Sequence, residues 1–191
     1  MPPKKKFSKE QIIDAAFEIA KVEGIDHITI RKVADQLESS IAPIYVNFKD
    51  VEELKREVVK KIVALSHQLL LEQDTGNPFH DIGVASLRFA KEYSVLFRDF
   101  IMKQNDYLET YDQDLGNDLI EIMKKDSDLG GFTTEELSII LLKMRVFSAG
   151  LSVMVANGLL PEEFGEERGV ELLDSTAEDV IIAARHRKKD E

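Results

Sequence analysis

Apolar residues recur along most of this chain at intervals of three and four positions, and strand-like alternation is nearly absent. Such intervals place side chains on one face of an α-helix. Proline and glycine gather between the long periodic segments, where they separate helices rather than interrupt them. The pattern therefore predicts an all-α fold made of helices joined by short polar turns.

Short helices are expected at the start of the chain. Ser8 and Gln11 form a capping box that begins the first helix, and Gly24 is expected to end it in a left-handed conformation. Thr29 suits the N-cap of a second helix that ends near residue 37.

A third short helix is expected after a polar turn. Ser40 is its expected N-cap, and Pro43 fits its first turn because an N–H there would have no helical partner. Asp50 and Glu53 then form a capping pair for a long fourth helix that runs to about residue 73.

The remaining sequence predicts further helices. The clearest begins after Thr133, which forms a capping box with Glu136, and ends at Gly158. The expected ranges are about 79–93, 95–105, 110–128, 133–157 and 166–187.

Composition excludes several kinds of site. The chain of 191 residues has no cysteine, which excludes disulfides, thiolate metal sites and thiol catalysis. None of its four histidines has more than one further histidine or carboxylate at helical spacing, and no phosphate-binding glycine loop or nucleophile elbow is present. No apolar run reaches the roughly 18 residues that a membrane span needs. We therefore expect a cytoplasmic protein with no membrane contact, no cofactor, no metal and no enzyme activity.

The net charge of −11 argues at first against a nucleic-acid partner. The charge is unevenly distributed, however. Residues 1–61 hold 12 basic and 11 acidic residues, a net of +1, whereas residues 62–191 carry a net of −12. The acidity therefore belongs to the later part of the chain, and the first part has a different electrostatic character.

Two short helices joined by a tight turn, with a helix before them, have the layout of a helix-turn-helix unit. The second of the pair is expected to enter the DNA major groove, where small residues permit close approach and polar side chains reach phosphates. We expect residues 1–50 to form this DNA-binding domain and residues 51–191 a second helical domain, with the helix at about 50–73 connecting them. The candidate DNA-binding residues are Lys4, Lys5, Lys6, Thr29, Arg31, Ser39, Ser40, Ala42, Pro43, Tyr45, Asn47, Lys49 and Lys55.

Residues 8–61 resemble the DNA-binding domain of the TetR family of bacterial transcriptional regulators. The resemblance lies in Ile12-Ile13-Asp14-Ala15-Ala16, Gly24, Ile28-Thr29-Ile30-Arg31-Lys32-Val33-Ala34, Ile44-Tyr45-Val46-Asn47-Phe48 and Glu52-Glu53-Leu54. It implies a ligand-responsive regulator, in particular a repressor that a small molecule releases from a palindromic double-stranded DNA operator.

The chain departs from the family pattern at several positions. Glu38 occupies the turn position where the family usually has glycine, Asn47 replaces the usual histidine, and Val51 replaces a lysine that often touches phosphate. Lys49 and Lys55 are the nearest substitutes for that lysine. These departures leave open an alternative function, a helical small-molecule carrier or adaptor whose DNA-binding domain is vestigial.

Aromatic and methionine side chains in the acidic part could line a cavity for a small apolar or amphipathic effector, or simply fill a core. The candidates for effector binding are Phe89, Tyr93, Phe97, Phe100, Tyr107, Met123, Met144 and Phe147. The resemblance also implies a homodimer formed by the last two long helices of each subunit. The candidates for that interface are Ser148, Leu151, Val155, Leu173, Ala177, Val180, Ile181 and Ala184.

Overall fold

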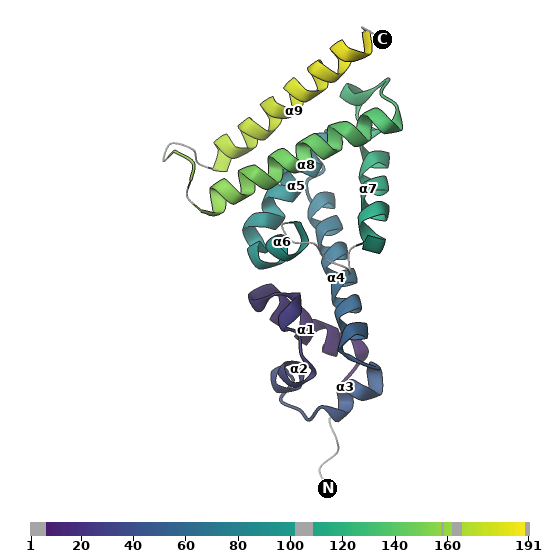
Figure 1. Ribbon diagram of the computed structural model, residues 1–191, viewed down its shortest axis with the longest axis vertical. Coiled ribbons are helices and arrows are strands. Elements are labelled where there is room, and N and C mark those ends of the chain that lie inside the picture. Colours follow the sequence, from purple (N-terminus) through teal and green to yellow (C-terminus); the bar gives the residue numbers. More distant parts are fainter. Residues whose placement is uncertain (1–6, 102–108, 158, 162–165, 190–191) are drawn as a thin grey trace. The chain divides into compact units, whose positions relative to one another are not determined.

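The computed structural model describes residues 7–101, 109–157, 159–161 and 166–189, and all regular secondary structure in these ranges is helical (Figure 1). The all-α prediction is confirmed. The chain forms two compact units. The first unit comprises Met1–Leu65 and Tyr93–Leu108, and the second comprises Ser66–Glu92 and Glu109–Glu191.

Three short helices open the first unit, as the sequence predicts. They are α1 (Lys9–Glu23), α2 (Ile30–Gln36) and α3 (Ala42–Asn47), with a 3₁₀ turn η1 (Ile25–His27) after α1. The unit also contains the first part of α4 (Val51–Leu71) and all of α6 (Ser94–Ile101). The first unit therefore extends into α4, and it is discontinuous in sequence because α6 also belongs to it.

The two ends of α1 follow from its sequence. At its start, the Ser8 hydroxyl accepts from the Gln11 N–H at 3.1 Å, and the Gln11 side chain accepts from the Ser8 N–H at 2.9 Å, which confirms the capping box. Gly24 ends the helix with φ 103° and ψ 162°. This is an extended conformation with positive φ rather than the left-handed helical one predicted, and essentially only glycine adopts it.

The core of the first unit joins one face of each helix. α1 contributes Ile12 and Ala16, α2 contributes Val33, and α3 contributes Ile44, each fully buried. From α4 the buried residues are Leu54, Val58, Val59 and Ile62. Because each helix buries only one face, this core fixes how α2 and α3 are rotated about their own axes.

A buried carboxylate attaches α6 to the end of α1. Asp99 is 4% exposed, and its Oδ2 accepts from the N–H of Ile25 at 3.0 Å. A Cβ added to Gly24 would lie 2.4 Å from the same oxygen. Gly24 thus has two functions, since it adopts the positive φ and leaves room for the Asp99 carboxylate.

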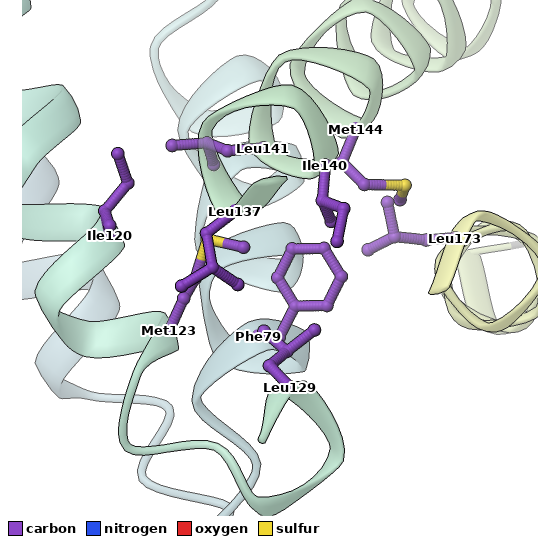
Figure 2. Packing of buried hydrophobic residues seen from close by; sticks show 9 residues of the cluster. All are labelled: Phe79, Ile120, Met123, Leu129, Leu137, Ile140, Leu141, Met144 and Leu173. Carbon is purple, nitrogen blue, oxygen red and sulfur yellow. The ribbon is translucent and has the colours of Figure 1, made fainter. Parts of the chain in front are cut away.

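The second unit is built from the end of α4, α5 (Pro78–Glu92), α7 (Glu109–Met123), a 3₁₀ turn η2 (Ser127–Leu129), α8 (Thr134–Ala156) and α9 (Glu166–Lys189). In Figure 2, side chains from α7, α8 and α9 converge around the ring of Phe79 on α5. This Phe79 cluster contains Phe79, Ile120, Met123, Leu129, Leu137, Ile140, Leu141, Met144 and Leu173.

The expected helix at 110–128 is too long at its C-terminal end, because the structure ends α7 at Met123. Asp126, which is 6% exposed, accepts from the N–H groups of Asp128 at 2.8 Å and Phe79 at 3.2 Å. This local and long-range capping stabilises a turn where apolar periodicity alone predicts continued helix.

The start of α8 is confirmed. The Thr133 hydroxyl accepts from the Glu136 N–H at 3.2 Å, and the Glu136 carboxylate accepts from the Thr133 N–H at 2.6 Å. Within the described residues, Thr134–Met154 is the one helical stretch long and apolar enough to cross a membrane by length and composition alone. The core helix of a helical domain meets the same two criteria, and α8 supplies four residues of the Phe79 cluster.

Replacing Gly24 with alanine is expected to destabilise the protein by about 2 kcal/mol or more, because the new Cβ adds backbone strain and collides with Asp99. Urea unfolding followed by circular dichroism measures the loss. Gly76→Ala is the control, since Gly76 also has positive φ (83°) but would place its Cβ in open space. Equal losses in the two variants would show that the Asp99 contact adds nothing.

Candidate nucleic-acid interface

The turn between α2 and α3 is formed without glycine. Glu38 has φ 48°, in the left-handed region that a glycine would occupy at lower cost. Its N–H donates to the Asp35 carbonyl at 3.0 Å, and the Ser39 N–H donates to the Ala34 carbonyl at 2.9 Å. The departure at Glu38 therefore leaves the helix-turn-helix geometry intact.

The predicted N-cap of α3 is wrong by one residue. Ile41 occupies the N-cap position, and no side chain caps the helix. A cap at Ser40 would accept from the N–H two or three residues later, and Pro43 has no N–H to give. The Ser39 hydroxyl donates to the Ser40 carbonyl at 3.0 Å instead. Pro43 itself lies in the first turn, as predicted.

The burial of Ile44 and Phe48, which are 0% and 2% exposed, directs the opposite face of α3 to solvent. This exposed face consists of Ala42, Tyr45 and Val46, and the N-cap residue Ile41, which precedes the helix, is also exposed. Val46 is 85% exposed, Tyr45 54% and Ile41 46%. The sequence analysis selected Ala42 and Tyr45 and missed Ile41 and Val46. A helical projection from Ile44 and Phe48 would have found Val46, whereas Ile41, three positions before Ile44 and seven before Phe48, projects onto their side of the helix.

Two polar candidates also act within the fold. The Asn47 amide donates to the Pro43 carbonyl at 2.9 Å and to the Phe7 carbonyl at 3.4 Å, so its N–H groups face the protein backbone. The Thr29 hydroxyl accepts from the Lys32 N–H at 3.2 Å and is the N-cap of α2, as predicted. Its own O–H proton can still be donated to a phosphate, because a hydroxyl both donates and accepts.

Several cations of the first unit have acidic partners. Lys9 pairs with Glu57 at 3.8 Å, and Lys55 pairs with Glu52 at 3.2 Å. Lys32 bonds to Glu23, and this hydrogen bond lowers the pKa of the Glu23 carboxyl below its usual range. The Lys55 side chain is only 12% exposed, which makes it a poor candidate for a phosphate contact.

Arg31, Lys49 and Arg56 differ from these paired cations. Each is exposed, and none forms an ion pair among the described residues. Arg31 lies in the first turn of α2, and Lys49 follows α3 by two residues. Arg56 is a further cation that the sequence analysis did not select. Lys4, Lys5 and Lys6 lie outside the described residues.

The effector candidates fall in both units. Phe89, Met123 and Met144 are buried in the second unit, where Phe147 packs beside the Phe79 cluster. Tyr93, Phe97 and Phe100 belong to the first unit. Tyr107 lies outside the described residues. The two methionines are themselves members of the Phe79 cluster, so core packing accounts for their burial.

Several dimer candidates are already covered within one protomer. Ser148, Leu151 and Leu173 are at most 5% exposed, and the side chain of Val155 lies outside the described residues. The α9 candidates Ala177, Val180, Ile181 and Ala184 pack against the Phe79 cluster. The exposed large apolar residues of these two helices are Ile139, Leu142, Val146, Met154 and Ile182.

Acidic and histidine side chains do not converge on a metal site. Among the described residues, no group of three or more His, Asp or Glu side chains could hold a metal ion. His80 instead pairs with Asp174 on α9, with 2.6 Å between Nδ1 and Oδ1. This contact joins the start of α5 to α9 inside the second unit.

No family model matches the chain, and no curated protein matches it. Solved structures do share its fold. A TetR-like transcriptional regulator from Rhodococcus sp. RHA1 matches with a TM-score of 0.63 and 18% identity, covering 88% of this chain and 92% of the other. A proposed transcriptional regulator from Pseudomonas aeruginosa PAO1 matches with a TM-score of 0.68 and 17% identity, covering 94% and 92%. At these identities the likeness shows the fold, which is that of TetR-like transcriptional regulators.

Proposed function

We propose that the protein is a DNA-binding transcriptional regulator, in particular a homodimeric repressor that a small effector releases from its operator. The observation that carries the proposal is the exposed face of α3, flanked in sequence by Arg31 and Lys49, which have no ion-pair partner among the described residues. The shared fold with TetR-like regulators supports it. Such a protein acts on DNA in the cytoplasm and needs no cofactor.

Operator binding is proposed to use α3 in the major groove and the start of α2 beside it. We expect the Thr29 hydroxyl, the Tyr45 hydroxyl and the Arg31 and Lys49 side chains to contact phosphates, and such contacts position the protein without specifying sequence. The net negative charge of the chain does not prevent DNA binding. Release of counterions from DNA depends on the cations that contact phosphates, and the cations available for this are those without an acidic partner.

Dimerisation is proposed to use α8 and α9. Ile139, Leu142 and Val146 recur at intervals of three and four on α8 and are 50%, 60% and 68% exposed. An exposed apolar stripe of this kind commonly marks an association surface. In a two-fold dimer the stripe would pair with itself, and the two α3 helices would read half-sites about 34 Å apart in a palindromic operator.

Effector binding is proposed for the second unit, where a buried hydroxyl lacks a partner. Ser152 on α8 is 5% exposed, and its Oγ has no hydrogen-bond partner among the described residues. A buried polar atom without a partner costs stability, which a ligand with a hydrogen-bonding group would recover. Release of DNA then requires that the effector bind better to a conformation that does not fit the operator.

Replacing Arg31 or Lys49 with alanine is expected to weaken binding to DNA upstream of the protein's own gene. Loss of one phosphate contact reduces the magnitude of the slope of log affinity against log salt by about 1. Fluorescence anisotropy across a salt series measures both effects. The control is Lys60→Ala, which removes an exposed cation that is paired with Glu57. Absence of salt-sensitive, sequence-selective binding by the unmutated protein would favour the carrier alternative.

Glutamate at Leu142 or Val146 is expected to convert the dimer to a monomer, because a charge would be buried in the proposed apolar interface. Light scattering after size-exclusion chromatography measures the mass. Operator affinity should fall by about 100-fold as the advantage of two linked half-site contacts disappears. Leu71→Glu is the control, since Leu71 is 78% exposed at the end of α4. A dimer that persists in both α8 variants would refute this interface.

Alanine at Ser152 is expected to raise the free energy of unfolding by about 1 kcal/mol, because it removes a buried hydroxyl without breaking a hydrogen bond. Urea unfolding of the purified, effector-free protein measures the change. Ser138→Ala serves as the comparison, because the Ser138 hydroxyl donates to the Thr134 carbonyl at 2.9 Å and its loss should not stabilise. If Ser152→Ala destabilises the protein, the Ser152 hydroxyl already has a hydrogen-bond partner in solution. It would then no longer support an effector site in the second unit.

A further inference from the structure

The exposed face of α3 contains no side chain that can hydrogen-bond a base in two places. The exposed side chains of α3 and its N-cap are Ile41, Ala42, Tyr45 and Val46, and the Tyr45 hydroxyl is their one polar side-chain group. Asn47 is the one amide on the helix, and it donates to the Pro43 and Phe7 carbonyls. The surface that would face the bases is therefore apolar.

Direct reading of bases in the major groove follows a small set of chemistries. Guanine is recognised by Arg or Lys, adenine by Asn or Gln, and cytosine by Asp or Glu. None of these residue types is on the exposed face of α3. The remaining major-groove feature is the C5-methyl group of thymine, which apolar side chains contact. The composition of the face thus favours the thymine methyl group over base features that need an amide, a carboxylate or a cation.

The exposed apolar side chains at α3 are close together in sequence, and we call Ile41, Tyr45 and Val46 the patch. Val22 on α1 is 73% exposed and stands alone, which is common on protein surfaces. Ile41, Tyr45 and Val46 are instead three large exposed side chains within six positions. Arg31 and Lys49, unpaired among the described residues, flank the patch in sequence on either side. Positive charge and apolar side chains together fit DNA, whose phosphates are anionic and whose thymine methyl groups are apolar.

We propose that α3 selects its DNA site through thymine methyl groups, with Val46 as the main contact and Ile41 as the second. The inference rests on the proposed function and specifies which chemical feature of the operator α3 recognises. Sequence selection then depends on apolar contact at thymines, while the cations supply affinity without selectivity. The occupant of the patch is double-stranded DNA, in preference to a second copy of the chain or another protein.

The test uses the full-length protein and a site selected from random double-stranded DNA. Each thymine of the selected site is replaced in turn by deoxyuridine, which pairs identically with adenine and lacks only the C5-methyl group. At one or more thymines in each half-site, affinity should fall by about fourfold, the effect expected for losing one buried methyl contact. The same substitutions are measured with Val46→Ala and, as the matched control, with the exposed valine variant Val22→Ala.

Val46→Ala should reduce the uracil effect at its contacted thymine to within about twofold, whereas Val22→Ala should leave it unchanged. A selected site at which no uracil weakens binding by more than about twofold overturns the inference and leaves the proposed function standing. Failure to select any site overturns both. A change of oligomeric mass in Val46→Ser would place a second copy of the chain on the patch and would likewise overturn the inference.

Discussion

The central constraint of the first unit is that α3 is only six residues long. A helix of that length is not stable alone in water, so its conformation depends on tertiary contacts. Those contacts are the burial of Ile44 and Phe48 and the hydrogen bonds from Asn47, one of which reaches the Phe7 carbonyl before α1. Lys9 lies 5.3 Å from the centre of the Phe48 ring and covers it from α1. The same contacts that make the helix possible decide which side chains it exposes.

Local rules predicted local features well. The capping boxes at Ser8 and Thr133 and the N-cap at Thr29 depend on residues three positions apart, and all three are present. The two errors in helix ends arose where a group elsewhere in the chain overrides the local pattern. Pro43 has no N–H for a cap at Ser40, and Asp126 ends α7 by accepting from Phe79, 47 residues away.

Side-chain roles were harder to predict than helices, because pairing and burial are properties of the folded chain. Lys55 and Asn47 have suitable chemistry for phosphate contacts, but Lys55 is mostly buried beside Glu52 and Asn47 is bonded to backbone carbonyls. Ser148 and Leu151 have the spacing expected of a dimer interface, yet both are buried within the single chain. Net charge has the same weakness. It counts every cation equally, whereas the folded unit neutralises most of them and leaves few available.

The return of α6 to the first unit makes that unit discontinuous in sequence. If residues 1–65 were grafted onto another sensor domain, the Ile25 N–H would lose its Asp99 acceptor, and the space left open by Gly24 would be unfilled. Recombination between relatives at the end of the helix-turn-helix would break the same contact. The smallest exchangeable module therefore includes Ser94–Ile101, and substitutions at residues 24 and 99 should be inherited together.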